Sequence, residues 1–303
     1  MLIVSGLNEI SSDFHNFPAK PVGIIVVGST VNKGYFYKAR DACKTYCTRH
    51  GYFYNTLARS ELNAIRQNLI DWRADLVITH SVPVIPMNVL DTLSLGAMNL
   101  HHSLLPAYRG GNPLLWQVID GVSDIGVSVH RLSEKADHGD LFRQIAFERP
   151  PAVSKSALAY QANIEHGLGL LKTVIRDYLS GCLQPTAQPT IAPDEPANHF
   201  PLERLLTILS ERQASLSQLW DVAHLFGYWP EQSISERGWR AWVRWVPKDI
   251  RRWGEMHRAE PTGDAYRFKA VGRCLHLQHA DGCIIFTPKW HGRTVLVRLL
   301  LKR

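Results

Sequence analysis

The amino-acid sequence predicts an α/β fold, with a Rossmann-like parallel sheet in the N-terminal part and a smaller C-terminal domain of helices and a β-meander or barrel. Two observations predict this arrangement. Short apolar runs alternate with stretches of helical composition over the first half of the 303 residues, as in parallel sheets with crossover helices. Five prolines then fall within residues 183–201, which is typical of a linker between domains.

The N-terminal elements follow one another in a regular order. Residues 2–6 and 22–29 are apolar runs, which indicate strands buried on both faces. Residues 36–50 have helical composition and end at Gly51, which suits a helix end, and residues 60–72 repeat the helical pattern. The remaining elements are expected to be strands over 74–81, 97–103, 126–132 and 140–148, and a helix from about Ser154 to Leu179 that Gly181 closes.

The rest of the chain has a different pattern. We predict an N-terminal domain over residues 1–182, the linker over 183–201 and a basic, tryptophan-rich domain over 202–303. Ser215 is a candidate N-cap of a helix that ends before Gly227. Beyond it, strands are expected over 265–271, 273–279, 283–287 and 294–301, with Asp281–Gly282 as a hairpin turn.

Composition excludes several classes of protein. A hydrophobic fraction of 45% is that of a globular chain. No apolar run approaches the ~20 residues that span a bilayer, and the N-terminus has no signal-peptide pattern, so we expect a cytoplasmic protein without membrane contact. The five scattered cysteines are expected to be reduced thiols, and no metal-ligand spacing occurs. The absence of a G-x-G-x-x-G motif makes a dinucleotide cofactor unexpected.

Positive charge is concentrated in the last third of the chain. Residues 1–200 contain 17 Lys+Arg and 17 Asp+Glu, whereas residues 201–303 contain 17 and 10, together with seven of the nine tryptophans. Aromatic and basic residues together can bind nucleic acid or a phosphorylated ligand. A solvated basic surface over a tryptophan-rich core explains the same composition, and the sequence leaves both open.

The most informative segment is residues 99–113, NLHHSLLPAYRGGNP. Asn99 and His101 are two apart and therefore face the same side of an extended strand, while His102 is turned away. A carboxamide donor beside an imidazole suits acyl transfer. Asp137 follows in ADHGD, 38 residues after Asn99, and Gly139 in that segment allows close approach of the backbone.

The pattern N-x-H-x-S-L-L-P-x-Y-R-G-x-x-P, followed by D-x-G, resembles the folate-dependent formyltransferases over about residues 74–150. These include methionyl-tRNA formyltransferases and sugar N-formyltransferases. The resemblance implies a catalytic trio of Asn99, His101 and Asp137 and 10-formyltetrahydrofolate as cofactor. In that mechanism Asn99 donates to the oxyanion, His101 takes the amine proton, and Asp137 orients His101 or holds a water.

The resemblance also implies where the ligands bind. The pterin is expected against an apolar loop and the backbone of residues 134–137. The candidate cofactor-binding residues are Val82, Val84, Ile85, Leu90, Glu134, Lys135 and Ala136. The candidate substrate-binding residues are Ser103, Arg109, Asn112 and Trp116. Two of these have a second interpretation, since Ser103 can fix the turn and Arg109 can brace its loop.

The acceptor is the less determined part of the reaction. The segment 110–116, with Asn112 and Trp116, and the segment 126–130, which ends in His130, are similar to the corresponding segments of the sugar N-formyltransferases. The region from 7 to 35 looks too short for the basic loop of the tRNA enzymes. We therefore expect a small-molecule amine, an amino sugar on a nucleotide. The alternatives are methionyl-tRNA, another small amine such as an amino acid, and hydrolysis of the formyl folate by water. The sequence does not predict the oligomeric state.

Overall fold

The computed structural model describes residues 1–5, 11–28, 35–150, 158–159, 161–190, 196–198, 215, 217–218 and 221, and four strands between residues 253 and 288. The chain divides into two compact units. The first unit comprises Met1–Pro113, Asp124–Glu148 and Tyr160–Asn198. The second unit comprises Leu114–Ser123, Arg149–Ala159 and His199–Arg303.

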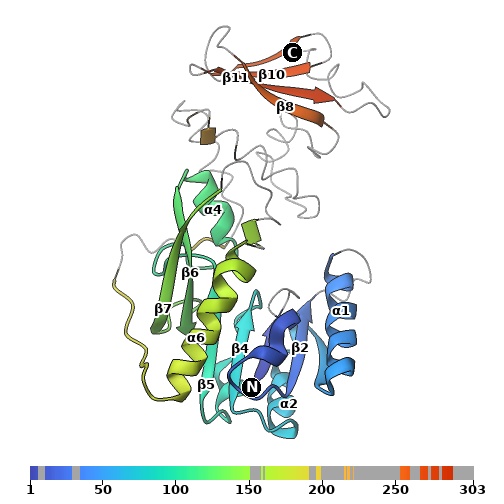
Figure 1. Ribbon diagram of the computed structural model, residues 1–303, viewed down its shortest axis with the longest axis vertical. Helices are drawn as coiled ribbons and strands as arrows, with labels where there is room; N and C mark the ends of the chain where they lie inside the picture. Colours follow the sequence, from blue (N-terminus) through green and yellow to red (C-terminus); the bar gives the residue numbers. More distant parts are fainter. Residues whose placement is uncertain are drawn as a thin grey trace. The chain divides into compact units, whose positions relative to one another are not determined.

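A seven-stranded sheet in the order β3-β2-β1-β4-β5-β6-β7 organises the first unit (Figure 1). The neighbouring pairs among β1 to β5 are parallel, and β6 is antiparallel to both β5 and β7. The α/β class is therefore confirmed, while the sheet is mixed rather than wholly parallel. The strands are β1 (Leu2–Ser5), β2 (Gly23–Gly28), β3 (Phe53–Ala58), β4 (Leu76–His80), β5 (Gly96–His101), β6 (Asp124–Arg131) and β7 (Leu141–Glu148).

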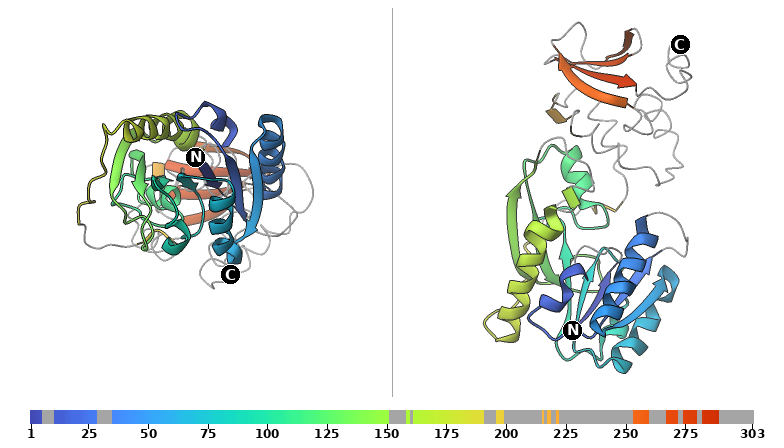
Figure 2. Two further views of the ribbon diagram at one scale, coloured as in Figure 1. Left: turned by 90° about the horizontal axis from the view of Figure 1, so that it is seen from below. Right: turned by 45° about the vertical axis from the view of Figure 1, so that its right-hand side comes forward.

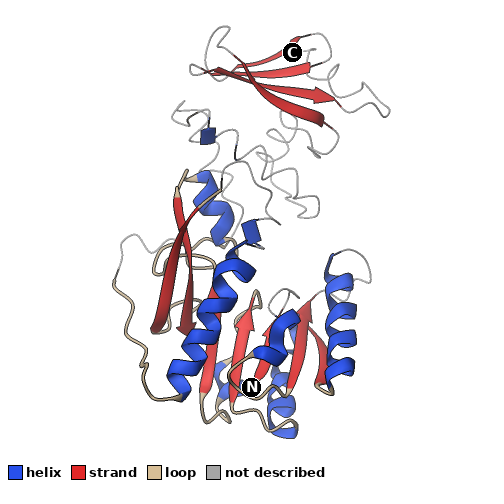
Figure 3. Ribbon diagram, viewed as in Figure 1, coloured by secondary structure: helices blue, strands red, loops and turns tan. Residues whose placement is uncertain are grey.

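Helices and shorter helical turns of the first unit pack beside this sheet (Figure 3), whereas α4 (Pro113–Ile119) belongs mainly to the second unit. Helix α1 contacts β2 and β3, whereas α6 contacts β6 and β7, at opposite ends of the strand order (Figure 2). Among the described residues, no helix is both long and apolar enough to cross a bilayer. The helical elements are η1 (Ser11–Asn16), α1 (Tyr35–His50), η2 (Arg59–Ala64), α2 (Ile65–Asp71), α3 (Met87–Leu90), α4 (Pro113–Ile119), η3 (Gln161–Gly167) and α6 (Leu168–Leu179).

The core lies where the predicted apolar strands meet α2 and α3. All residues of β1 and β4 are buried, as their apolar sequences predict. Removing an aliphatic side chain of this kind from water is worth about 1.5–3 kcal/mol. The core cluster is formed by Leu2, Val4, Ile25, Val27, Ile65, Leu69, Ala74, Val77, Ile85, Val89, Leu90 and Ala97.

Three local predictions need correction. Strand β3 was not predicted because it is an edge strand without a single fully buried residue, so it has no continuous apolar run. The helix expected over 60–72 is a 3₁₀ turn followed by α2, since Glu61 has non-helical dihedrals and its carboxylate accepts the Ala58 N–H. The helix expected from Ser154 includes a π-helical turn, η3, before α6, and residues 151–157 lie outside the described ranges.

Helix-end predictions agree with the structure. Gly51 and Gly181 follow α1 and α6 with φ of 68° and 75°, the left-handed conformation that glycine adopts without steric cost. Ser215 Oγ accepts the backbone N–H of Gln218 at 3.1 Å, as an N-cap does. Most of the helix predicted beyond Ser215, and Gly227 after it, lie outside the described residues.

The second unit contains a four-stranded antiparallel sheet in the order β8-β11-β10-β9. Of the predicted hairpin turn at Asp281–Gly282, Gly282 is instead the first residue of β11 and pairs with His279 at the end of β10, and Asp281 lies outside the described residues. Strand β8 was not predicted, because its sequence WGEMHRA has no apolar alternation. The strand expected over 294–301 lies outside the described residues. The strands are β8 (Trp253–Ala259), β9 (Arg267–Val271), β10 (Cys274–His279) and β11 (Gly282–Pro288).

Candidate active site

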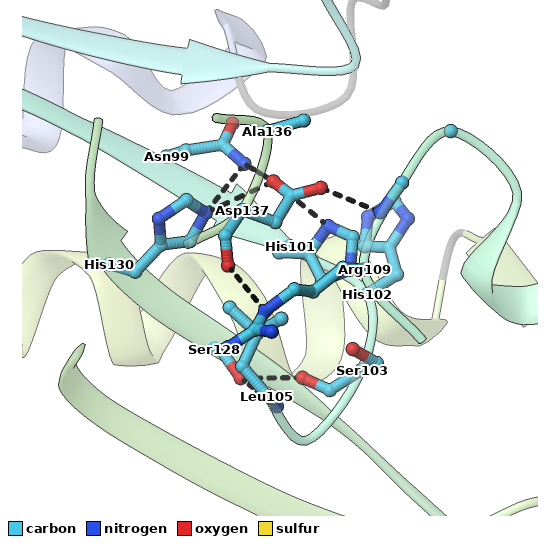
Figure 4. Close-up of polar contacts among 12 residues, drawn as sticks. Asn99, His101, His102, Ser103, Leu105, Arg109, Ser128, His130, Ala136 and Asp137 are labelled. Carbon is cyan, nitrogen blue, oxygen red and sulfur yellow. Dashed lines mark hydrogen bonds and ion pairs between the residues drawn. The ribbon is translucent and has the colours of Figure 1, made fainter. Parts of the chain in front are cut away.

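Polar side chains from β5, β6 and the β6–β7 connection converge near the carboxyl end of β5 (Figure 4). Strand alternation places Asn99 and His101 on the same side of β5, as the sequence predicts. His130 on β6 is the register partner of Asn99. Asp137 follows β6 and contacts all three side chains. Ligands of open α/β sheets bind at such strand ends.

The carboxamide of Asn99 has a fixed orientation. Thr79 Oγ1 on the neighbouring strand β4 donates to Asn99 Oδ1 at 2.9 Å. The Nδ2 atom therefore faces the site, 3.1 Å from His130 Nε2 and 3.3 Å from Asp137 Oδ1. Its two N–H groups are donors of the kind that stabilise an oxyanion. Sequence reasoning missed Thr79, whose contact with Asn99 depends on strand pairing.

His101 is a buried imidazole with one nitrogen fixed by the backbone. Its Nε2 donates to the Tyr108 carbonyl at 2.9 Å, so Nδ1 carries the lone pair of the neutral ring. Nδ1 lies 3.6 Å from Asp137 Oδ1. Burial lowers the pKa of His101, and the attraction of Asp137 opposes this only in part. The neutral ring, with Nδ1 as a proton acceptor, therefore predominates at neutral pH.

Asp137 is the negative centre of the site. Its Oδ2 accepts the Gly110 N–H at 2.8 Å, and its Oδ1 faces both imidazoles. Burial alone would raise the pKa of this carboxyl, but His101, His130 and the Gly110 N–H together hold it well below its ordinary value. Asp137 therefore stays ionised, and a positive charge that forms on His101 has a counter-ion beside it.

His130 is a fourth member that sequence reasoning did not place in the site. Only 2% of its surface is exposed, and its Nδ1 donates to the Arg131 carbonyl at 2.8 Å. Its Nε2 lies 3.2 Å from Asp137 Oδ1. The sequence indicated His130 only as a similarity to the sugar enzymes. The sequence places His130 in the predicted strand over 126–132, but it does not show which strand pairs with this one. The contact of His130 with Asn99 could therefore not be predicted.

The four residues line a cavity of about 350 Å³ in the first unit. Of the predicted cofactor-binding residues, Val82, Val84, Ile85 and Ala136 line it. Val84 is 49% exposed, which leaves an apolar surface open to a ligand. Leu90 is in the buried core instead, and Glu134 and Lys135 are not among the lining residues. Leu132 and Ser133 line the cavity from the same loop and were not predicted.

The four candidate substrate-binding side chains are not among the lining residues. Ser103 is buried and donates to the Ala107 carbonyl at 2.6 Å, so it fixes the turn. Arg109 is also buried and donates to the backbone carbonyl of Asp137. Both contacts favour the bracing interpretation. That these side chains bind a substrate stays a prediction.

The other two candidates have structural contacts as well. Asn112 Nδ2 donates to the Asn198 carbonyl at 2.8 Å. Trp116 is buried on α4, in the second unit. In the glycine turn that precedes Asn112, Gly110 and Gly111 line the cavity. From residues 103–116, the cavity is therefore lined by Gly110, Gly111 and Pro113 rather than by the predicted side chains.

A second histidine pair joins His102, which follows β5, to His80 at the end of β4. His102 Nε2 is 3.1 Å from His80 Nε2, so one ring donates to the other. The alternation that turns His102 away from Asn99 agrees with this contact. His102 nevertheless lines the same cavity. Both His101 and His102 therefore line the cavity, and His101 lies beside the Asp137 carboxylate.

Metal-ligating residue types and the Cys47 thiol are two further features of the described part of the chain. There, no group of three or more histidine, cysteine, aspartate or glutamate side chains is placed to hold a metal ion. Cys47 is buried and not in a disulfide. Burial raises the pKa of its thiol to about 12, which makes it a poor nucleophile.

Comparison with known proteins gives matches of two kinds. Residues 22–171 match the formyl transferase family. The methionyl-tRNA formyltransferase of Lactobacillus acidophilus is 32% identical over 121 residues, which are 40% of this chain and 38% of that protein. The chain thus spans about two fifths of the length of this curated relative.

Two solved structures share the fold. HypX from Aquifex aeolicus, in complex with tetrahydrofolic acid, superimposes with a TM-score of 0.53 at 16% identity, over 86% of this chain and 43% of that one. WlaRD is a sugar 3N-formyl transferase crystallised with dTDP and 5-N-formyl-THF. It also superimposes with a TM-score of 0.53, at 13% identity, over 96% of this chain and 98% of that one. At these identities the likeness concerns the fold.

Proposed function

We propose that this chain, residues 22–171 of which match the formyl transferase family, transfers a formyl group from 10-formyltetrahydrofolate to a primary amine. The observation that carries the proposal is the contact of Asn99, His101 and ionised Asp137 at one cavity. These groups supply an oxyanion donor, a proton acceptor and a counter-ion. Formyl transfer to an amine requires the first two directly.

Each side chain has a defined task in this reaction. Asn99 Nδ2–H donates to the formyl oxygen as that oxygen gains negative charge, and one such donor is worth about 3 kcal/mol. His101 Nδ1 accepts the proton that the attacking amine loses. Asp137 stabilises the imidazolium that results, because its carboxylate lies 3.6 Å from Nδ1. The bond between the formyl carbon and the folate nitrogen then breaks as that nitrogen takes the proton from His101, and the formyl group stays on the amine nitrogen.

The lining of the cavity supports a folate as the formyl donor. Val82, Val84 and Ile85 provide an apolar wall, and the loop at Leu132 and Ser133 brings peptide groups to the same cavity. A flat heteroaromatic ring with polar edges needs both kinds of surface. HypX and WlaRD, which share the fold, were solved with folates, and this supports the same ligand class here.

An amino sugar on a nucleotide is the first candidate acceptor. WlaRD supports it, because this sugar 3N-formyl transferase shares the fold over nearly the whole of both chains and was crystallised with dTDP. Methionyl-tRNA is the second candidate. The identity to a methionyl-tRNA formyltransferase supports it, as does the excess of 17 Lys+Arg over 10 Asp+Glu in residues 201–303.

The test is an acceptor screen with 10-formyltetrahydrofolate. Amino-sugar nucleotides, amino acids and charged initiator tRNA are scored for formylation, and formate release without acceptor is measured in parallel. Formylation of tRNA and of no other acceptor would rule out an amino sugar as the substrate. Release of formate with no transfer to any amine would support a hydrolase instead.

A variant set then tests the site itself. His101→Ala is expected to lower turnover at least ~100-fold with the fold intact, because the proton acceptor is lost. Asn99→Ala and Asp137→Ala are expected to have losses of the same order. His50→Ala, an exposed histidine on α1, is the matched control. Near-normal turnover in His101→Ala would contradict the mechanism.

A further inference from the structure

One glutamine contacts both loops that complete the site. Gln188 follows Thr186, whose backbone exchanges two hydrogen bonds with Leu141 at the start of β7, at 2.7 and 2.8 Å. This pairing brings the segment after α6 beside the β6–β7 connection, where Asp137 lies. The segment falls within the predicted Pro-rich linker, which sequence reasoning treated as a spacer only.

The carboxamide of Gln188 uses its whole hydrogen-bonding capacity on these two loops. Nε2 donates to the carbonyl oxygens of Asp137 at 2.8 Å and Gly139 at 2.7 Å. Oε1 accepts from Arg109 Nη2 at 2.7 Å and Nε at 3.2 Å. Two donors and one oxygen with two lone pairs are all that a carboxamide has. A side chain that only donates or only accepts hydrogen bonds cannot make both kinds of contact.

Asp137 has a backbone conformation that depends on such support. Its φ is 58°, in the left-handed region, which costs a residue other than glycine about 1–2 kcal/mol. Residues of this kind persist where their surroundings hold them. Gln188 Nε2 and Arg109 Nε both donate to the Asp137 carbonyl. The direction of the carboxylate follows from the backbone that these two side chains hold.

We propose that Gln188 is a positioning residue that ties the Arg109 loop to the Asp137 loop and thereby holds the Asp137 carboxylate against His101. The Gly110 N–H on Asp137 Oδ2 comes from the same loop as Arg109, so movement of either loop alters both contacts of the carboxylate. The attraction between Asp137 and His101 falls with their separation. This inference deepens the proposed function, on which its catalytic consequence rests.

The test compares two glutamine-to-leucine variants of the full chain. Gln188→Leu removes both donors and the acceptor at nearly constant volume. Gln144→Leu is the matched control, since Gln144 Nε2 also donates to a loop carbonyl, that of Leu105 at 2.8 Å, and to Ser128 Oγ at 2.7 Å. Both variants lose half-buried hydrogen bonds, so both are expected to lose stability. Only Gln188→Leu is expected to alter the surroundings of His101.

The decisive readout is the ring-nitrogen NMR titration of His101 without substrate. Asp137 raises the pKa of His101, so its displacement in Gln188→Leu is expected to lower the titration midpoint by at least about half a pH unit. The midpoint in Gln144→Leu should be that of the unmodified chain. With substrate, Gln188→Leu should lower kcat at least ~10-fold and change the KM for the formyl folate by less than about threefold.

The titration is measured without any enzymatic activity. It therefore tests the role of Gln188 even if the proposed formyl transfer is not found. An unchanged His101 midpoint in Gln188→Leu, with the same loss of stability as Gln144→Leu, would overturn the proposal. Gln188→Asn serves if the leucine variant does not fold, because it keeps a carboxamide that is one methylene too short to reach both loops. An unchanged midpoint in Gln188→Asn would overturn the proposal equally.

Discussion

Two backbone carbonyls decide which nitrogen of each imidazole faces Asp137. The Tyr108 carbonyl takes the N–H of His101 Nε2, and the Arg131 carbonyl takes that of His130 Nδ1. The other nitrogen of each ring therefore lies on the side of the Asp137 carboxylate. The tautomers are set by the main chain, as is common where one ring nitrogen has a chemical task.

At this scale we predict a shift in pH dependence. His101 acts as a base when neutral, and burial places its pKa below the ordinary value of about 6.5, so the acid limb of kcat/KM should lie below that pH. Asp137→Asn removes the charge that raises this pKa, and the limb should move to still lower pH as turnover falls. A pH–rate profile of both proteins measures this. Movement of the limb to higher pH would contradict the assignment.

The connection between β6 and β7 is the element on which the site depends most. It places Asp137 beside β5, and it reverses the chain where the two strands meet. At Gly139 a Cβ atom would lie 1.8 Å from the Arg131 carbonyl oxygen, closer than any side chain permits. Glycine at this position is therefore required by the close approach of the two strands.

Gly139→Ala is accordingly expected to destabilise the protein by at least ~2 kcal/mol, because the backbone must shift to remove the overlap. Gly169→Ala is the control in helix α6, where a Cβ atom meets nothing within 4 Å. That substitution should be neutral or stabilise by about 0.5–1 kcal/mol. Urea denaturation measures both. Equal stability of the two variants would contradict the packing argument.

At the scale of the whole molecule, a buried ion pair joins distant parts of the chain within the second unit. Arg149 Nη2 lies 2.8 Å from Asp221 Oδ2, with 9% and 4% of the two side chains exposed. Arg149 Nε also donates to the Val122 carbonyl at 2.8 Å. The pair thus connects residues 72 positions apart in the sequence. Removing one partner leaves a buried charge without its counter-ion.

We therefore expect Asp221→Ala to lower the free energy of unfolding by about 3–5 kcal/mol. Asp91→Ala is the comparison, since its pair with Arg66 is exposed (43% and 55%) and should contribute less than about 1 kcal/mol. Denaturant unfolding of both variants at neutral pH measures the difference. A loss of less than about 1 kcal/mol in Asp221→Ala would show that the pair is solvated in solution.

Much of the fold could be predicted from local patterns. Buried strands such as β1 and β4 are continuous apolar runs, and the helix ends at Gly51 and Gly181 follow from glycine chemistry. Edge strand β3 and strand β8 could not be predicted, because neither has a continuous apolar run. The direction of β6 was missed since strand pairing leaves no mark on the local pattern.

The sequence by itself determined the buried strands, the shared face of Asn99 and His101, and the separation of His101 from His102. These follow from the period of two along a strand, which neighbouring residues define. Only the tertiary structure decided that Thr79, His130 and Gln188 join the site. Thr79 and His130 contact Asn99 from 20 and 31 positions away, and Gln188 contacts Asp137 from 51 positions away. Such contacts depend on strand order, register and chain reversal rather than on local spacing.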